Sequence, residues 1–368
     1  MDITALKEFI EGIRKEVGVP YLDVICYQEH KEMFRYLSGD ATTGKERLYM
    51  YSCGKPITVV SALRLIDEGK MMSLDDKVCD YLPEVKNAFI LNENGEKEYV
   101  GEQMLIRHLF TMTAGFTYDV YAQPVMQLVK ESEGKATLRD YIAKFVESPL
   151  AFAPGEKYLY SLCHDVLAAV VEVITGKKFS AYVKECIFDP LQMNESRFDN
   201  QETGMTDVYM AYENGEVKYI EEDKCLVPTP SYESGGAGLV STVEDYIRFA
   251  DAMACGGVAK NGYRVLSEEG LKQLTSEQLK EITINNSFTC VQGDDYGYGL
   301  GVRIRRVATD WGLNKGEFGW DGAACSYVMV DPEKKISIFI GAHLRNWPFV
   351  FTGKHLSIVE KVYKTFQF

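Results

Sequence analysis

Apolar residues recur with the spacing of an amphipathic helix near both ends of the chain. The first set comprises Leu6, Phe9, Ile10, Ile13 and Val17. The second set, within residues 356–366, comprises Ile358, Val359, Val362 and Tyr363. These patterns predict a helix at each end, each with one apolar face to bury against the rest of the protein.

Runs rich in β-branched and aromatic residues predict strands near the N-terminus and in the last third of the chain. Residues 21–27 and 32–37 form one such pair, joined near 28–31. The later runs are 297–304, 325–330 and 335–342, the last of which follows the turn-forming segment 331–334. We expect these runs to form antiparallel hairpins in one sheet, against which the two terminal helices pack.

Between about residues 80 and 235 the patterns indicate mainly helices and loops, for example at 105–110 and 165–174. The predicted fold is therefore α+β. It has a discontinuous sheet domain, made of residues 1–80 and 236–368, and a mainly helical insertion over 81–235.

The composition narrows the possible partners. The 368 residues are 46% hydrophobic and carry a formal net charge of −14. This acidity argues against a nucleic-acid or anionic-membrane partner. No segment has the run of about 18 apolar residues that a membrane span needs. Because the N-terminus also lacks a basic, then apolar, signal pattern, we expect a cytoplasmic protein, unless a leader has been removed. Nothing in the sequence indicates an oligomeric state.

Cysteine and histidine do not follow the spacing of a metal site. The nine cysteines form no C-x-x-C pair, and their odd number cannot all pair within one chain, so we expect reduced thiols. The five histidines show no H-E-x-x-H pattern and no cluster with cysteine at metal-ligand spacing. We therefore expect no metal and no organic cofactor.

Ser52 and Lys55 are the strongest candidates for chemistry. They form an S-x-x-K pattern at the start of an apolar-faced helix that ends near Gly69. On a first helical turn, the Lys55 amine can reach the Ser52 hydroxyl. The N-terminus of a helix also supplies amide groups and positive potential for a developing oxyanion. The alternative is that Ser52 only caps the helix.

The spacing by itself is weak support, because Ser132 and Lys135 match the same pattern. This second match lies in a charged segment that contains Gly134, and no apolar-faced helix continues from the lysine. We predict a solvated loop there, without catalytic function.

Several further segments, in the same order along nearly the whole chain, resemble the superfamily of serine β-lactamases and penicillin-binding proteins. The resemblance is to its branch of class C β-lactamases and family VIII carboxylesterases. Residues 52–58 resemble the S-x-x-K helix start of that branch, and 67–83 the stretch after it. Residues 106–116 are similar to its "IRHLLTHTSGL" segment, 154–161 to the lead into its Y-x-N motif, and 236–245 to its "GGLVST-x-x-D" segment. The resemblance implies a β-lactamase/transpeptidase-like fold.

The resemblance also implies roles for individual residues. Ser52 is the nucleophile, Lys55 assists it, and Tyr160 is the general base. A phenol can accept a proton at neutral pH only if its pKa of about 10 is lowered by a neighbouring cation such as Lys55. The alternative for Tyr160 is one buried core tyrosine among 23. The oxyanion would lie between the backbone amides of Ser52 and of Ala323, the latter on an edge strand.

Two departures from the family pattern bear on the substrate. Leu162 stands where the Y-x-N motif has asparagine, and Trp320-Asp321-Gly322 stands where the family has K-T-G or H-x-G. Some family VIII esterases have W-G-G there. Leu162 cannot hydrogen-bond an amide, and Asp321 would repel an anionic substrate if it faced the cleft. Arg345, beyond the last strand, could still bind a carboxylate.

The predicted function is therefore that of a serine hydrolase that acts through an acyl-enzyme on small ester or amide substrates. Its partner would be a small-molecule acyl substrate, held near Leu162, Trp320, Asp321, Gly322 and Arg345. Two alternatives stay open at this point. One is a β-lactamase or D-amino-acid-specific peptidase, and the other is a non-catalytic descendant of the fold that binds a ligand.

Overall fold

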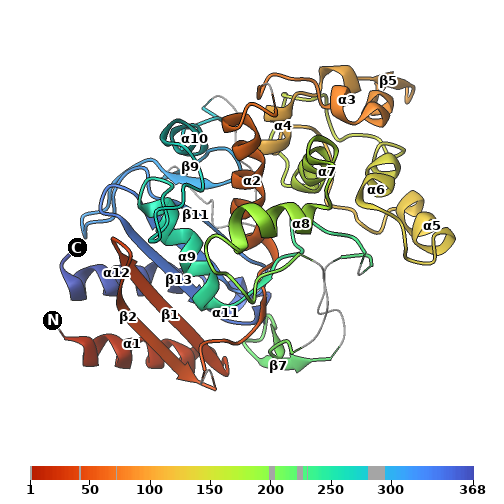
Figure 1. The fold of residues 1–368 in the computed structure, drawn as a ribbon. Coiled ribbons are helices and arrows are strands. Elements are labelled where there is room, and N and C mark those ends of the chain that lie inside the picture. The colour runs from red at the N-terminus through yellow and green to blue at the C-terminus, as the bar shows by residue number, and fades with distance from the viewer. Residues whose placement is uncertain are drawn as a thin grey trace.

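A computed structural model describes residues 2–40, 43–71, 73–198, 204–221, 227–229, 231–280 and 295–368. Within them, a seven-stranded antiparallel sheet forms the centre of the region nearer the two termini (Figure 1). Its strands, in spatial order, are β2 (Lys31–Gly39), β1 (Tyr21–Gln28), β13 (Ile336–Gly341), β12 (Tyr327–Asp331), β11 (Phe318–Asp321), β10 (Arg303–Arg305) and β9 (Tyr296–Tyr298). The register places Ile25 opposite Phe339 and Trp320 opposite Val328.

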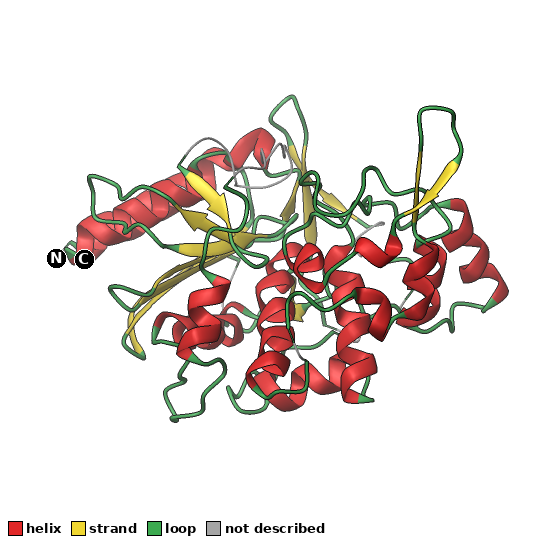
Figure 2. Ribbon diagram, turned by 90° about the horizontal axis from the view of Figure 1, so that it is seen from above, coloured by secondary structure: helices red, strands yellow, loops and turns green. Residues whose placement is uncertain are grey.

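The two terminal helices cover one face of this sheet. They are α1 (Ile3–Val17) and α12 (Lys354–Phe366). Leu6 and Ile10 of α1 and Val359 of α12 share a core with Ile338 of β13. The view in Figure 2 shows the N- and C-termini next to each other at the end of these helices. The predicted helices at the two chain ends, and their packing on one sheet, are confirmed.

The opposite face of the sheet carries α9 (Val243–Ala254), which packs on β1, β12 and β13. A second, mainly helical region lies beyond it and is built around α2 (Lys55–Asp67). Helix α2 packs against α7 (Cys163–Thr175) and is buried along most of its length. The smaller helices are α3 (Val78–Tyr81), α4 (Ile106–Phe110), α5 (Gln123–Glu131), α6 (Leu138–Phe145), α8 (Phe179–Val183), α10 (Glu268–Leu274) and α11 (Pro348–Phe351).

Short strands also occur outside the large sheet. They are β3 (Leu48–Tyr49), β4 (Phe89–Leu91), β5 (Lys97–Tyr99), β6 (Val208–Ala211), β7 (Val217–Ile220), β8 (Val240–Ser241) and β14 (Leu344–Arg345). Strand β14, near the C-terminus, pairs with β6 from the middle of the chain. The division of the chain into a sheet domain and an insertion over 81–235 stays a prediction.

One predicted strand is wrong. The run 297–304 is not continuous, because β9 and β10 are separated by a turn in which the Gly299 amide donates to the Val302 carbonyl at 2.9 Å. Gly301 has a φ of 77°, which glycine adopts without steric cost. The two glycines therefore convert an apparently continuous apolar run into a hairpin.

Two other expectations concern the cysteines and the membrane. The seven cysteines among the described residues are all free thiols, while Cys225 and Cys290 lie outside those residues. In the described part of the chain, none of the helices has both the length and the apolar character that crossing a bilayer requires. A cytoplasmic location stays a prediction.

Candidate active site

Ser52 lies where the sheet region meets the helical region. It belongs to a short 3-10 helix, Tyr51–Gly54, that runs directly into α2 at Lys55. The Lys55 Nζ donates to Ser52 Oγ at 3.2 Å, as the S-x-x-K spacing predicted. The Tyr160 hydroxyl donates to the same oxygen at 2.6 Å. The structure therefore brings the three predicted catalytic residues together around one serine oxygen.

Aromatic rings surround this group. The ring of Tyr160 stacks on Trp320, with centroids 5.9 Å apart, and on Tyr118, with centroids 5.5 Å apart. The Lys55 Nζ lies 4.6 Å from the Tyr160 ring centroid and 5.4 Å from that of Tyr118. Tyr118 therefore lies beside the same group, on the ring face of Tyr160 and near the Lys55 amine. Sequence reasoning missed Tyr118, which follows the segment 106–116 by two residues.

The environment of Lys55 favours the neutral amine. Its side chain is fully buried, and this burial lowers its pKa to about 7. The negative charges of Asp165 and Asp321 act in the opposite direction but do not offset the burial. The Nζ also donates to the Gly236 carbonyl at 2.7 Å, which fixes its position beside Ser52. A lysine with such a pKa can exchange a proton near neutral pH.

The pKa of Tyr160 departs from the prediction. A general base would need a lowered pKa, but burial raises the pKa of this phenol well above its ordinary value. The hydrogen bond with Ser52 acts in the lowering direction and is the smaller effect. The condition for a base role, a lowered pKa, is therefore not met in this environment, and the Tyr160 hydroxyl instead donates to Ser52 Oγ. The general-base role of Tyr160 stays a prediction.

Asp165, on α7, is a second residue that sequence reasoning missed. It is fully buried, and its Oδ1 accepts hydrogen bonds from the Tyr232 hydroxyl at 2.9 Å and from Ser234 Oγ at 2.5 Å. Its charge is the largest influence that raises the pKa of Lys55. The one signal in the sequence is an acidic residue inside the apolar run of α7.

The loop after Ser234 passes close to Asp165 and Lys55. A Cβ on Gly236 would lie 2.6 Å from Asp165 Oδ2 and 3.4 Å from Lys55 Nζ. A residue with a side chain would therefore displace Asp165, so glycine is required where the loop passes Lys55.

The segment Trp320–Ala323 reaches Ser52 from the large sheet. Trp320 and Asp321 are buried at the end of β11, and a Cβ on Gly322 would lie 2.4 Å from the carbonyl oxygen of Met50. Ala323 is exposed in the turn between β11 and β12, not on an edge strand, because β11 lies between β10 and β12. The edge-strand prediction is wrong, although the segment does lie beside the serine turn.

The remaining predicted substrate residues are less central. Leu162 is buried at the start of α7 and lines a cavity of about 50 Å³ with Phe116 and Pro149. Arg345 is partly exposed on β14. Two residues later, the Trp347 indole donates to the Gly322 carbonyl at 3.1 Å, which attaches this segment to residues 320–322. Asp321 is buried, so its carboxylate is not exposed to solvent.

Within the described residues, one group of His, Cys, Asp or Glu side chains is close enough to share a metal ion. It consists of His30, Asp251 and Cys255 and includes none of the residues around Ser52. The arrangement at Ser52 can instead support nucleophilic chemistry, because it combines a hydroxyl, an amine with a pKa near neutrality and a phenol as proton donor.

Comparison with known proteins relates almost the whole chain to the family that its sequence motifs resemble. A family model described as "Beta-lactamase" matches residues 7–360. Protein Rv1367c of Mycobacterium tuberculosis is 28% identical, over 76% of this chain and 73% of that protein. Esterase EstB of Burkholderia gladioli is 31% identical, over 55% of each chain. Among solved structures, EstCE1, titled a hydrolase with promiscuous acyltransferase activity, superimposes with a TM-score of 0.77 at 20% identity, covering 98% of this chain and 99% of its own.

Proposed function

Because the chain belongs to the beta-lactamase family, we propose that it is a serine hydrolase that forms an acyl-enzyme on Ser52 and acts on small, uncharged esters. One observation carries the proposal. The Ser52 Oγ lies 3.2 Å from the Lys55 amine and 2.6 Å from the Tyr160 hydroxyl, in a site where burial lowers the pKa of Lys55 to about 7.

In the first step, the neutral Lys55 amine takes the Ser52 proton while Ser52 Oγ bonds to the carbonyl carbon of the ester. We assign the base to Lys55 and not to Tyr160, because burial raises the pKa of the phenol. The Ser52 amide lies in the first turn of its helix, where it has no acceptor within that helix. Together with the exposed Ala323 turn, it would bind the oxyanion of the tetrahedral intermediate.

In the second step, the carbon–oxygen bond to the leaving alcohol breaks, and the Tyr160 hydroxyl donates its proton to the alkoxide. Protonated Lys55 then returns a proton to Tyr160, which restores both groups. A water molecule then attacks the acyl-enzyme through the same two steps, so that the acid is released and Ser52 recovers its hydroxyl. The Lys55 amine and the Tyr160 hydroxyl both hydrogen-bond Ser52 Oγ, at 3.2 and 2.6 Å, which places the two proton carriers at the same oxygen.

The substrate class follows from the polar groups of the family motifs that this chain lacks and from the rings beside Ser52. Leu162 offers no hydrogen bond to an amide, and Trp320 stands in place of the lysine or histidine of the family's K-T-G or H-x-G motif. Partly exposed Tyr118 adds an aromatic surface beside Ser52. A site that has aromatic rings and lacks the family's lysine or histidine for a substrate carboxylate favours an uncharged acyl group over an anionic amide. The esterase name of the relative EstB supports the same assignment.

The test compares ester and β-lactam hydrolysis by the same protein. We expect turnover of p-nitrophenyl acetate and butyrate, little turnover of a chromogenic cephalosporin, and no turnover of either by Ser52→Ala. Ser132→Ala is the matched control, because it removes the other S-x-x-K serine. Cephalosporin hydrolysis without ester hydrolysis would favour the β-lactamase alternative. If a fluorophosphonate failed to label Ser52, the non-catalytic alternative would be favoured.

A further inference from the structure

A second cluster of reactive side chains lies at the end of α9. Asp251 is on the last turn of this helix and Cys255 caps it, four residues later. Residues four apart on a helix project from the same face. His30 reaches the same place from the turn between β1 and β2, so that residues more than 200 positions apart meet.

The three side chains point their potential ligand atoms at one another. His30 Nδ1 lies 2.7 Å from Asp251 Oδ2, and the His30 amide donates to Asp251 Oδ1 at 3.1 Å. The Cys255 Sγ lies 3.9 Å from Asp251 Oδ1. One nitrogen, one oxygen and one sulfur ligand atom all lie within 4.8 Å of one another. We propose that His30, Asp251 and Cys255 bind one zinc ion, with a fourth position left to water or a solute.

The ligand types suit zinc and argue against calcium and magnesium. Imidazole nitrogen, carboxylate oxygen and thiolate sulfur are its three kinds of protein ligand, whereas calcium and magnesium take oxygen ligands. Tetrahedral zinc, with bonds of about 2.0 to 2.3 Å, separates its ligand atoms by about 3.3 to 3.7 Å. His30 Nδ1 lies 2.7 Å from Asp251 Oδ2, and Cys255 Sγ lies 3.9 Å from Asp251 Oδ1, so small movements of the imidazole and the thiol would bring both atoms to these separations from one carboxylate oxygen.

The surroundings favour a cation. The Asp251 side chain is 5% exposed, and a buried carboxylate is stabilised by a positive partner. The C-terminal end of α9 adds the partial negative charge of its free carbonyl groups. Nearby, Lys335 is paired with Glu29 at 2.9 Å, so the two neighbouring charges cancel. His30 remains 27% exposed, which gives an ion a path from solvent.

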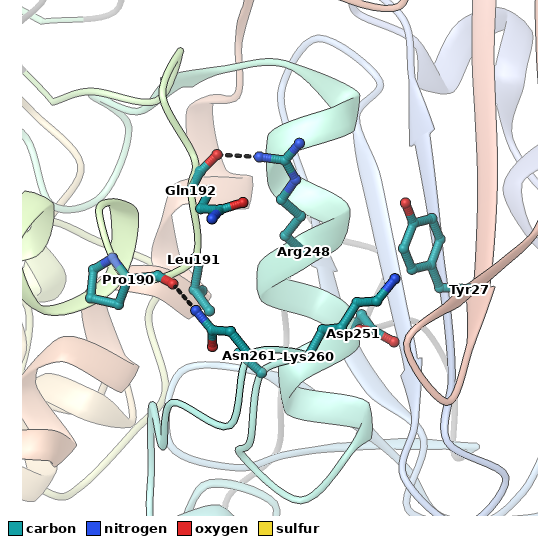
Figure 3. A pocket seen from close by; sticks show the side chains of 9 residues that line it. Tyr27, Pro190, Leu191, Gln192, Arg248, Asp251, Lys260 and Asn261 are labelled. Carbon is teal, nitrogen blue, oxygen red and sulfur yellow. Dashed lines mark hydrogen bonds between the residues drawn. The ribbon is translucent and has the colours of Figure 1, made fainter.

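Asp251 also lines a cavity of about 340 Å³, which is separate from the residues around Ser52. Figure 3 shows Asp251 and the Lys260 amine extending toward the side of this cavity on which Tyr27 lies. Arg248, one turn before Asp251 on α9, is held by Glu244 at 3.2 Å and by the carbonyl of Gln192. The cavity therefore supplies space and hydrogen-bonding groups next to one zinc ligand.

Binding of the ion is a proton exchange without oxidation or reduction. Zinc bonds to the Cys255 sulfur and the thiol proton leaves to solvent. His30 would bind the ion through Nδ1 as a neutral imidazole, with its remaining proton on Nε2.

The test uses the full chain after removal of metal by a chelator, titrated with zinc chloride against a chromophoric competitor. We expect one equivalent to bind, and the Cys255→Ser and His30→Gln variants to bind at least roughly tenfold more weakly. Cobalt chloride should give a thiolate-to-cobalt absorption band in the wild type that is absent in Cys255→Ser. Both substitutions are at partly exposed positions, so the fold should tolerate them.

Cys79→Ser is the matched control, since it removes a thiol outside the cluster, and it should bind zinc as the wild type does. Zinc should also raise the melting temperature of the wild type and of Cys79→Ser only. Equal zinc affinity in the wild type, Cys255→Ser and His30→Gln would overturn the proposal, as would a wild type that binds no zinc. The cluster would then be a hydrogen-bonded contact that holds the β1–β2 turn against α9.

Discussion

The S-x-x-K pattern occurs twice in this chain, and the two copies lie in opposite environments. Ser52 is followed by the start of α2, whereas Ser132 follows the end of α5. Lys55 is fully buried and 3.2 Å from its serine. The Lys135 side chain is 79% exposed and pairs with Glu133 at 3.0 Å. The predicted solvated loop at Ser132 is confirmed.

The comparison shows what the four-residue spacing leaves undecided. A helix N-terminus presents free amides and positive potential, which stabilise an oxyanion, while a helix C-terminus presents carbonyls and negative potential. Burial then gives Lys55 a pKa of about 7, so that it can accept a proton near neutral pH. The catalytic potential of the motif therefore depends on which end of a helix the serine occupies and on whether the lysine is desolvated.

The sharpest test of this contrast is the loss of each serine hydroxyl in turn. We expect Ser52→Ala to lower ester kcat/KM by at least roughly a thousandfold, because the nucleophile is lost. Ser132→Ala should leave it unchanged. Both should be measured with p-nitrophenyl butyrate, alongside circular dichroism to confirm folding. Comparable losses in the two variants would break the distinction between the two copies.

The two lysines give the next largest difference. Lys55→Met should reduce kcat/KM on the order of a hundredfold to a thousandfold, because a positioned general base is removed while the packing volume is kept. Lys135→Met changes an exposed side chain and should have no effect on the rate. An active Lys55→Met enzyme would show that another group takes the Ser52 proton.

The sequence alone could predict much of this site and of the fold. The terminal helices, the β1–β2 hairpin and the grouping of Ser52 with Lys55 rest on local patterns that the structure confirms. Asp165 could not be predicted, because its effect on Lys55 depends on how α7 packs against α2, not on spacing along the chain. The same holds for His30 and Asp251, which are 221 residues apart.

The split between β9 and β10 shows a different limit. An alternating apolar run predicts a strand, but the two glycines at 299 and 301 allow the chain to reverse. The raised pKa of Tyr160 is a third case, since desolvation depends on the rings stacked around it in the folded protein.

The third prediction concerns the charge beside Lys55. Lys55 must be neutral to act as a base, so kcat/KM should rise with pH and reach half its maximum near pH 7. The Asp165 charge raises the pKa of Lys55, so Asp165→Asn should move this rise to lower pH. Full pH–rate profiles of both enzymes measure the shift. A purely structural role for Asp165 would lower the rate and leave the position of the rise unchanged.

The smallest expected effect separates the two stacked tyrosines of the site, Tyr118 and Tyr160. Tyr118→Phe keeps the ring beside Lys55 and removes a hydroxyl that takes no part in the proposed proton transfers, so kcat/KM should fall by no more than roughly a few-fold. Tyr160→Phe removes the proposed proton donor and should cost on the order of a hundredfold. The reverse ranking would transfer the donor role to Tyr118. Because the two rings stack on each other, the difference between the variants reports on the hydroxyl groups and not on the shared aromatic packing.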